Sequence, residues 1–425
     1  MVGGGFTGLW VALLAAEREP GRRVVLVEAD RIGEGASGRN GGFADPSITH
    51  GIPNGLHHFP SEMEPLIALG RENFRELHEA LARHDVDAHY DGNGKLEVAA
   101  APHWVPPLRE HHEVLSRFGE DTLWLDREAA RDQLDSPTYH AAVWHRTGGV
   151  LDPGRLCFGL RDAARRLGVR IHEGTPVTDL ARDGARVVLR VPGGRLRASK
   201  AVVATNAYRS PLRRMRRAVI PVWDYVLVTE PLSASQRNAI RWKEGQGVGD
   251  ASNQFHYYRL TRDGRILWGG YDAIYHYGSG IAPELEQRAA SFELLARHFF
   301  ETVPQLEGLR FSHAWGGPIA TTTRFCLDSG SAFGGRVAWS IGYTGLGVAA
   351  SRFGARIALD RLDHPESATL RLRLVRRRSF PWPPEPLRYL VVQLTRWELA
   401  RADRNEGRRG PWLRLLDRLG LGFDS

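Results

Sequence analysis

The stretch MVGGGFTGLW, residues 1–10, decides the fold of this chain. It places Gly3, Gly5 and Gly8 in the spacing Gly-x-Gly-x-x-Gly, which is typical of loops that bind the pyrophosphate of a dinucleotide. The first two glycines let the backbone turn tightly and approach a phosphate, and the third lets a helix pack closely on a strand. Such a pattern is weak by itself, so its sequence context decides whether a nucleotide binds.

The residues that follow supply this context. An apolar run through Ala16 predicts a helix, and Val24 to Val27 predict a strand that ends in Glu28. Glu28 lies 20 residues beyond Gly8, where an acid accepts hydrogen bonds from the ribose of adenosine. An acid rather than an arginine at this position disfavours a cofactor with a 2′-phosphate. The chain therefore begins with a Rossmann-type loop, helix and strand.

The strand in front of the glycine loop is unusually short. Only Met1 and Val2 precede Gly3, whereas a strand typically has about five or six residues. About three or four apolar side chains are therefore missing, each worth roughly 1.5–3 kcal/mol when buried. Their sum is comparable with a typical total stability of about 5–15 kcal/mol. We expect the N-terminal strand to be truncated here and the natural start to lie upstream.

Composition narrows the class of protein. With 425 residues, 42% of them hydrophobic, the chain can bury a large core and form two or three domains. No apolar stretch approaches the roughly 18 residues that span a bilayer, so no membrane partner is expected. The net charge of +8 comes almost entirely from arginine, without a recognisable nucleic-acid-binding module, so no nucleic acid is expected either. An oligomer is possible.

Cysteine and histidine spacing gives no sign of a disulfide framework or a metal site. Cys157 and Cys326 form no Cys-x-x-Cys pair, which favours a reducing compartment and predicts a cytoplasmic protein. The doublets His57-His58 and His111-His112 lack the i, i+4 spacing that brings two ligands onto one helical face. We therefore expect no bound metal.

A second glycine-rich segment, ASGRNGGF at residues 36–43, follows the ribose acid closely. Arg39 is suited to neutralising a phosphate, and Gly41-Gly42 can admit a flat ring against bare backbone. This segment resembles the second signature of the D-amino acid oxidase family of flavoproteins, which includes glycine and sarcosine oxidases and γ-glutamylputrescine oxidases. The resemblance implies FAD and argues against an enzyme that uses NAD alone.

Three further blocks resemble the same family, in the family's order. They are residues 149–177, where Val177 corresponds to the valine whose backbone holds adenine, residues 201–208, and residues 340–348. In the last block a helix starting near Gly347 points its N-terminal dipole toward the flavin, and Leu346 stands where relatives often have histidine. The cofactor contacts that the resemblance implies are Gly3, Gly5, Phe6, Thr7, Gly8, Glu28, Ala29, Ser37, Arg39, Asn40, Gly41, Gly42, Val177, Thr205, Gly342, Gly345, Leu346 and Gly347.

The predicted fold class is α/β, with a Rossmann-type FAD-binding domain interleaved with an antiparallel-sheet α+β substrate domain. Three parts of the chain follow from the order of the blocks. They are the FAD-binding domain, residues 1–50, 149–219 and 325–365; the substrate domain, residues 51–148 and 220–324; and a C-terminal helical extension, residues 366–425.

The clearest element of the substrate half is a hairpin over residues 255–271. Asp263-Gly264 between alternating strands is a strong signal for a two-residue turn. The resulting register pairs Arg262 with Arg265, Arg259 with Trp268, and Tyr257 with Gly270. Because cross-strand partners share a face, Tyr257, Arg259 and Trp268 are expected on one side of the sheet.

This face is the predicted substrate site. Arginine grips a carboxylate with a planar fork and tyrosine adds a hydroxyl donor, so Arg259 and Tyr257 are candidate anchors, with Trp268 and Tyr271 beside them. An alternative remains open, in which Arg259 pairs with an internal acid and Tyr257 belongs to the core. Tyr271, with Tyr275 to Tyr277, lines the pocket entrance or packs on the surface.

The cofactor determines the chemistry that the resemblance implies. The flavin accepts hydride from the carbon that bears a neutral amine, and the resulting imine is hydrolysed. The substrate is then an amine or amino acid, and no essential general base is expected. Electrons pass to O2, giving H2O2, or in a dehydrogenase to a quinone or an electron-transfer protein. A degenerate flavin-binding protein without turnover is the remaining alternative.

Two departures from the family bear on these expectations. Sarcosine oxidase relatives carry a lysine near the flavin on the strand that corresponds to Leu267–Tyr271, and this segment has none. Some members attach FAD through a cysteine, but Cys326 does not align with that attachment. We therefore predict non-covalent FAD.

The segment from Phe380 to Pro386 marks the end of the flavin domain. Beyond it, Leu387 to Arg401 has apolar residues at helical spacing. This helix packs against the body or forms a partner or dimer surface. A helix lying on a membrane would account for the basic residues, but the pattern is too ordinary to predict it.

Overall fold

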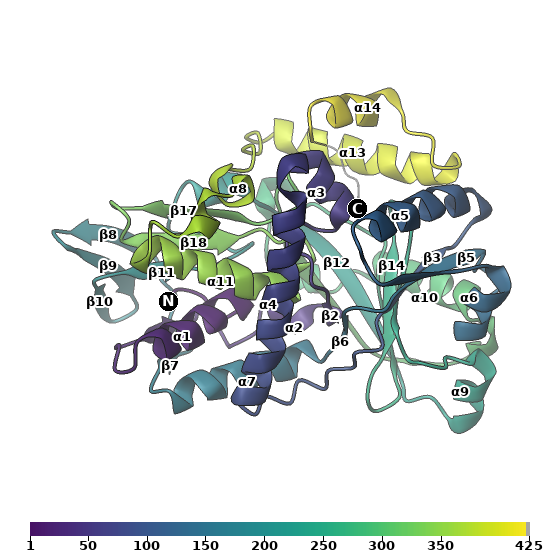
Figure 1. Ribbon diagram of the computed structural model, residues 1–425, viewed down its shortest axis with the longest axis horizontal. Coiled ribbons are helices and arrows are strands. Elements are labelled where there is room, and N and C mark those ends of the chain that lie inside the picture. The colour runs from purple at the N-terminus through teal and green to yellow at the C-terminus, as the bar shows by residue number, and fades with distance from the viewer. Residues whose placement is uncertain (422–425) are drawn as a thin grey trace.

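The computed structural model describes residues 1–421. Among these residues the strands form five sheets, which with their helices build two units side by side, and the C-terminal helices lie across the top (Figure 1). The helices are α1 (Phe6–Arg18), α2 (Ala36–Arg39), α3 (Ile52–His58), α4 (Met63–Arg83), α5 (Val105–Arg117), α6 (Arg127–Gln133), α7 (Pro153–Arg166), α8 (Met215–Ala218), α9 (Ala234–Ile240), α10 (Ala289–Thr302), α11 (Gly347–Asp363), α12 (Arg373–Arg376), α13 (Leu387–Arg404) and α14 (Pro411–Arg418).

The strands of the two units alternate along the chain. The strands are β1 (Val25–Val27), β2 (Phe43–Ala44), β3 (Lys95–Ala99), β4 (Thr122–Leu125), β5 (Ala141–His145), β6 (Gly149–Val150), β7 (Arg170–His172), β8 (Asp179–Asp183), β9 (Arg186–Val191), β10 (Gly194–Ala198), β11 (Ala201–Val203), β12 (Ile220–Thr229), β13 (Gly247–Asp250), β14 (His256–Leu260), β15 (Ile266–Gly270), β16 (Phe311–Thr321), β17 (Asp328–Ala332) and β18 (Val337–Ile341). The interleaved α/β class is confirmed. The exact domain boundaries stay a prediction.

The first strand of the nucleotide-binding unit is represented by Val2. It forms parallel bridges with Val27 of β1 and Val203 of β11, so it lies between these two strands. Its amide donates to the carbonyl oxygen of Val202 at 2.9 Å, and the amide of Gly3 donates to Val27 at 2.9 Å. The glycine loop therefore leaves the sheet at the central position that a dinucleotide fold requires.

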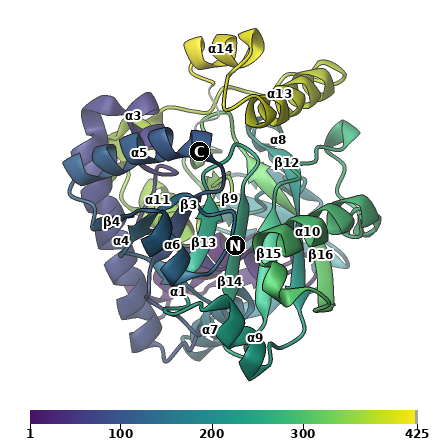
Figure 2. The same ribbon diagram turned by 90° about the vertical axis from the view of Figure 1, so that its right-hand side faces the viewer.

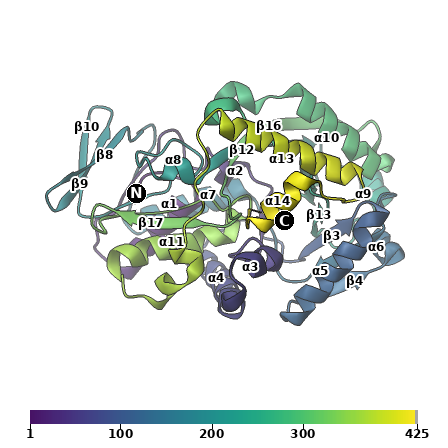
Figure 3. The same ribbon diagram turned by 90° about the horizontal axis from the view of Figure 1, so that it is seen from above.

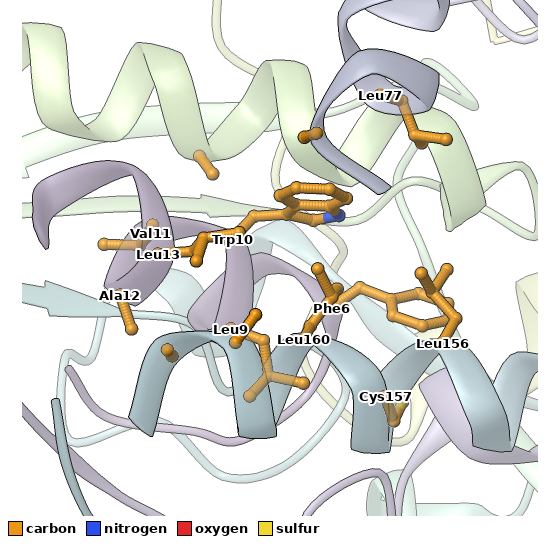
Figure 4. Close-up of a cluster of buried hydrophobic side chains, with 14 of the residues drawn as sticks. Phe6, Leu9, Trp10, Val11, Ala12, Leu13, Leu77, Leu156, Cys157 and Leu160 are labelled. Atoms are coloured by element: carbon orange, nitrogen blue, oxygen red, sulfur yellow. The ribbon is translucent and has the colours of Figure 1, made fainter. Parts of the chain in front are cut away.

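Helix α1 is buried along almost its whole length. Its side chains pack with those of α7 and α4 around Trp10, which is fully buried (Figure 4). Gly8 permits this packing, because a Cβ atom there would lie 1.9 Å from the carbonyl oxygen of Gly3. The close helix–strand contact predicted from the glycine spacing is thus present.

The other unit is built on an eight-stranded sheet in the order β16-β12-β15-β14-β13-β3-β5-β4. One face carries aromatic side chains into a core that includes Leu295 and Phe299 of α10. The opposite face turns toward the glycine loops. Side chains that alternate along each strand therefore divide between a dry core and a wall facing the nucleotide-binding unit.

The predicted hairpin exists, but its predicted register is wrong by one residue. Tyr258 pairs with Trp268, and Arg259 pairs with Leu267. The loop contains three residues rather than two, because Thr261 pairs with Arg265 through an amide-to-carbonyl hydrogen bond of 2.8 Å. Gly264 has φ +79°, as in a type I turn closed by a left-handed residue. The extra loop residue moves Trp268 to the face opposite Arg259.

The C-terminal extension forms the outermost layer. Helix α13 lies across the body with α14 beside it, as two further views show (Figures 2 and 3). The predicted helix over 387–401 is confirmed and continues to Arg404. Among residues 1–421, no helix is long and apolar enough to cross a membrane.

Candidate active site

A cavity of about 590 Å³ lies between the glycine loops and the face of the eight-stranded sheet. Its walls include the start of α1, the glycine-rich segment around α2, the turn before α11, and strands of the sheet. Parts of α3, α4, α5 and α13 complete them.

Two helices begin at this cavity. Helix α1 starts after Gly5 and α11 after Leu346, and neither of these residues caps its helix with a side chain. The first amides of a helix lack partners within it, and its dipole makes this end positive. The two N-termini therefore favour negative charge at the cavity wall. The predicted start of a helix near Gly347 is confirmed.

The glycine-rich segment is held in shape by its own side chains. Ser37 Oγ accepts a 2.8 Å hydrogen bond from the amide of Phe6, which ties the segment to the start of α1. Asn40 Oδ1 accepts from the amide of Gly42 at 2.8 Å, while its Nδ2 donates to the carbonyl oxygen of Ala36 at 2.9 Å. Because the Ser37 and Asn40 side chains are engaged in these bonds, they leave the backbone of the segment exposed to the cavity.

Arg39 has a different environment from the one expected. Its guanidinium contacts the carboxylate of Glu34 at 2.6 Å and that of Glu286 at 2.7 Å. Burial alone lowers the pKa of Arg39, but the hydrogen bonds with Glu286 and Glu34 raise it above its ordinary value. The charge of Arg39 is balanced within the protein, so the structure gives no support to its predicted role in neutralising a phosphate.

The predicted ribose-binding acid, Glu28, lies at the end of β1. Glu28 Oε2 accepts from the amide of Gly4 at 2.5 Å, which places the carboxylate next to the glycine loop. Its carbonyl oxygen accepts from the amide of Thr175 at 2.7 Å, and this contact brings the segment of Val177 to the same end. Thr205 Oγ1 is buried and has no hydrogen-bond partner among the described residues, as a group awaiting a ligand would be.

The predicted cofactor residues divide into two groups. Those that line the cavity are Gly5, Phe6, Thr7, Ser37, Arg39, Asn40, Gly41, Gly42, Gly345, Leu346 and Gly347. The others are Gly3 and Gly8, which pack against each other, and Glu28, Ala29, Val177, Thr205 and Gly342, which lie outside its lining. Contacts of each residue with the cofactor stay a prediction.

Of the predicted substrate residues, Tyr257 lies in the cavity wall. Its hydroxyl donates to Asp224 Oδ2. Its ring lies against Gly41 and Gly269, where a Cβ atom would come within 2.6 and 2.7 Å of the ring, respectively. Tyr257 is thus placed where the glycine-rich segment meets the sheet.

Asp224 is a cavity residue that the sequence analysis missed. It lies on β12, and burial raises the pKa of its carboxyl group to about 6, although the hydrogen bond from Tyr257 acts in the opposite direction. The signal that could have identified it is the charge itself, because Asp224 interrupts the otherwise apolar run of Ile220–Thr229. A carboxylate in such a strand is costly to bury and is often functional.

The other predicted substrate residues do not all reach the cavity. Arg259 is 7% exposed and lies outside the lining, and its Nε donates to the carbonyl oxygen of Gly41 at 2.5 Å. Trp268 is 1% exposed and packs against Tyr258 and Phe299 on the opposite face. Tyr271 does line the cavity.

Tyr275, which was expected near the pocket entrance, instead anchors the C-terminal extension. Its hydroxyl donates to Glu385 Oε1 at 2.5 Å, and its carbonyl oxygen accepts from Gln393 of α13 at 3.1 Å. Tyr277 also contacts Tyr389 of α13, so Tyr275 and Tyr277 pack against the extension, whereas Tyr271 lines the cavity.

A group of charged residues lines another part of the cavity and was also missed. Lys95 Nζ lies 3.7 Å from Asp45, and Glu97 contacts His111 at 3.2 Å and His145 at 3.1 Å. Although burial acts in the opposite direction, these two imidazoles lower the pKa of Glu97 well below its usual value. Attraction to Asp45 raises the pKa of Lys95, so Lys95 is charged at neutral pH.

Neither cysteine lines the cavity, and both are buried and unpaired. Among residues 1–421, no group of three histidine, cysteine or acidic side chains could hold a metal ion.

These features define the class of protein. A cradle of glycines that a Cβ would fill, two helix N-termini directed at one cavity and an acid at the end of β1 fit the pyrophosphate, flavin and ribose of FAD. The chain belongs to the DAO family, described as FAD dependent oxidoreductase, whose family model matches residues 1–361.

Known proteins agree with this assignment. The chain is 32% identical over 368 residues to gamma-glutamylputrescine oxidoreductase of Escherichia coli K12, covering 85% of this chain and 82% of that protein. It is similar in fold to the crystal structure of glycine oxidase from Geobacillus kaustophilus, with a TM-score of 0.71 and 21% identity over 86% of this chain and 94% of that one. L-proline dehydrogenase from P. horikoshii also gives 0.71, with 20% identity over 88% and 96%. The protein is therefore an FAD-dependent oxidoreductase of amines or amino acids.

Proposed function

We propose that this protein oxidises the C–N bond of an amine whose nitrogen binds at Asp224 and Tyr257, and that O2 accepts the electrons to give H2O2. Bound FAD supplies the acceptor for the hydride that leaves the substrate carbon. The glycine-rich segment and the start of α11 would hold the cofactor. The imine product then reacts with water.

The observation that supports this proposal most directly is the Asp224 carboxyl group in the cavity wall. An amine is mostly protonated at neutral pH, and its nitrogen must lose a proton before hydride can leave the neighbouring carbon. A carboxyl with a pKa of about 6 is ionised at neutral pH and suited to holding an ammonium group and accepting its proton. No general base was expected from the sequence, and Asp224 is our proposal for one.

Glu97 and its two histidine partners favour a long substrate with a second polar end. Glu97 pairs with Gly249, and Gly249 pairs with Tyr257 on the next strand. Since neighbouring strands are about 4.8 Å apart, Glu97 lies roughly 10 Å across the sheet from Tyr257. A substrate such as γ-glutamylputrescine, whose amine is separated from an α-amino acid group, would place its two ends at these two positions.

Lys95 supports O2 as the acceptor. We assign to Lys95, a residue of the same cavity lining, the role of the lysine that is absent from 267–271. A positive charge near the reduced cofactor stabilises the negative charge that develops on oxygen. We also propose non-covalent FAD, since neither cysteine lines the cavity, and a cytoplasmic location, since both thiols are unpaired.

The test is anaerobic mixing of the purified flavoprotein with a panel of amines that includes γ-glutamylputrescine, putrescine, sarcosine, glycine and D-amino acids. We expect the flavin absorbance to bleach with γ-glutamylputrescine or a similar long amine. Asp224→Asn should slow bleaching by about 100-fold or more, because a general base typically contributes that much. Retained flavin that no member of the panel bleaches would contradict turnover.

Peroxide formation then tests the acceptor. We expect stoichiometric H2O2 after air is admitted to the substrate-reduced protein. Rapid reduction by the amine, followed by reoxidation with a soluble quinone but not with O2, would identify a dehydrogenase and refute the oxidase.

A further inference from the structure

Helix α13 lies on the body in an unusual orientation. Its exposed side chains include Leu387 (54% exposed), Leu390 (61%), Leu394 (39%) and Trp397 (53%). The spacing of three, four and three residues places all four on one face of the helix. An amphipathic helix that only packs on a protein core turns such a stripe inward.

Several polar residues of α13 are turned inward instead. Glu398 is 5% exposed, and Arg396 contacts Asp272 at 2.7 Å. Asp403 accepts hydrogen bonds from the amides of Asn253 and Gln254 at 3.1 and 2.9 Å. The helix is thus fixed in place by polar contacts, and its apolar stripe is left at the surface.

Positive charge continues the same stripe. Arg401 and Arg404 follow Trp397 at the same helical spacing and are exposed, and the Arg401 guanidinium lies 5.5 Å from the Trp397 ring. Helix α14 adds exposed Leu415 and Leu419. Residues 387–421 contain eight arginines and four acids. Glu398 is buried against Gly410 and contacts Arg401, Asp403 accepts from the body, and Glu406 and Asp417 contact Arg408 and Arg409, so the excess of arginines leaves this surface with a net positive charge.

We propose that the surface formed by α13 and α14 binds an anionic lipid bilayer, with α13 lying in the plane of the interface. Leucine and tryptophan on a helix flanked by arginines suit the boundary between acyl chains and negatively charged headgroups. A second copy of this chain is disfavoured as the occupant, because a two-fold contact through this surface would place arginines against arginines.

The position of α13 connects this surface with the active site. Its outer face is the exposed stripe, while Val392, Arg396 and Leu399 on its inner side line the cavity. Since a helix with side chains is about 10–12 Å in diameter, the bound bilayer lies roughly one helix away from the substrate cavity. In Figure 2, α13 and α14 form the outer layer above the rest of the molecule.

The test is co-sedimentation of the full-length flavoprotein with vesicles of phosphatidylcholine alone and of phosphatidylcholine with phosphatidylglycerol. We expect binding to the anionic vesicles. This binding should weaken as salt is raised from about 50 to about 500 mM, because the added salt shortens the Debye length severalfold and screens the attraction. The double variant Leu390→Ser/Trp397→Ser should bind at least about tenfold more weakly, because both side chains enter the interface. Arg401→Gln/Arg404→Gln should reduce the salt dependence.

The control is Leu123→Ser/Phe158→Ser, which changes two exposed apolar residues far from the C-terminal helices in sequence. It should bind like the parent protein, and all variants should retain flavin absorbance. Equal vesicle binding by the α13 variant, or no binding to anionic vesicles at low salt, would overturn the proposal. A dimer in sedimentation velocity that the α13 variant abolishes, without vesicle binding, would assign the surface to a second copy instead.

Discussion

The Nε of Arg259 donates a hydrogen bond of 2.5 Å to the carbonyl oxygen of Gly41. This bond joins a strand of the sheet to the glycine-rich segment, 218 residues earlier in the chain. Burial lowers the pKa of Arg259, which shows how little of its charge reaches water. The arginine that the sequence marked as a substrate anchor therefore positions the cofactor cradle.

Arg259→Ala should weaken FAD binding more than substrate binding. Removing a buried donor that holds the loop typically costs about 1–3 kcal/mol, so we expect the flavin dissociation constant to rise roughly 5- to 150-fold. Fluorescence of released flavin measures this constant. Arg262→Ala, at an exposed arginine in the same hairpin, is the control. Normal flavin affinity with a raised KM for substrate would restore the anchor role.

Gly42→Ala should abolish stable flavin binding. Gly42 has φ +82°, and a Cβ atom would lie 2.0 Å from the carbonyl oxygen of Leu151, so the cradle must move. Gly21 has φ +92° but open space around it, which makes Gly21→Ala a matched control for backbone strain alone. We expect the control to remain yellow and to lose about 1–2 kcal/mol of stability. Equal flavin content in both variants would show that the contact with Leu151 does not matter.

Asp224 should make stability depend on pH. Its pKa is raised from 3.8 to about 6 in the folded protein, so the folded state keeps a proton that the unfolded chain releases between these values. Its favourable contribution is therefore full below about pH 4 and is lost as pH rises through 6. Relative to the parent, Asp224→Asn should gain about 3 kcal/mol between pH 4 and 7.

Urea denaturation at several pH values measures this difference. Asp183→Asn, at an exposed carboxylate of β8, is the control and should change little. A parallel pH dependence for Asp224→Asn and the parent would contradict a raised pKa.

Tyr257→Phe should shift the pH profile of catalysis. The Tyr257 hydroxyl donates to the Asp224 carboxylate and stabilises its ionised form. Without this bond the pKa of Asp224 rises further, so the rise of kcat/KM with pH should move above pH 6. Steady-state rates between pH 5 and 9 show this shift. A lower rate with an unchanged profile would mean that the tyrosine acts on substrate packing alone.

The glycine loops were predictable because their information is local. Gly3, Gly5 and Gly8 need only their spacing and the following helix to indicate a pyrophosphate site, and the turn before Gly347 is equally compact. The family resemblance then ordered the remaining blocks. The class of fold and the cofactor could therefore be predicted from the sequence.

The face of the sheet that lines the cavity was harder to predict from the sequence, because it depends on which strands pair and in what register. Asp224 and Tyr257 meet across 33 residues of sequence, and no local pattern indicates that contact. The hairpin register failed on one loop residue, since Asp263-Gly264 fits a two-residue turn as well as the three-residue loop that forms. Such a slip moves every side chain of one strand to the other face, which is how Trp268 was misplaced.

Lys95→Met should slow reoxidation by O2 without slowing reduction by substrate. Attraction to Asp45 keeps Lys95 charged inside the cavity, and methionine keeps its approximate length while removing that charge. We expect the rate constant for O2 to fall about 10- to 100-fold, as for loss of one electrostatic contact worth roughly 1.4–2.7 kcal/mol. Stopped-flow mixing of the reduced flavoprotein with O2 measures it. Lys200→Met, at a partly exposed lysine paired with Asp363, should react like the parent. If Lys95→Met slows bleaching by the amine instead, Lys95 binds the distal end of the substrate, and the charge that assists oxygen reduction lies elsewhere.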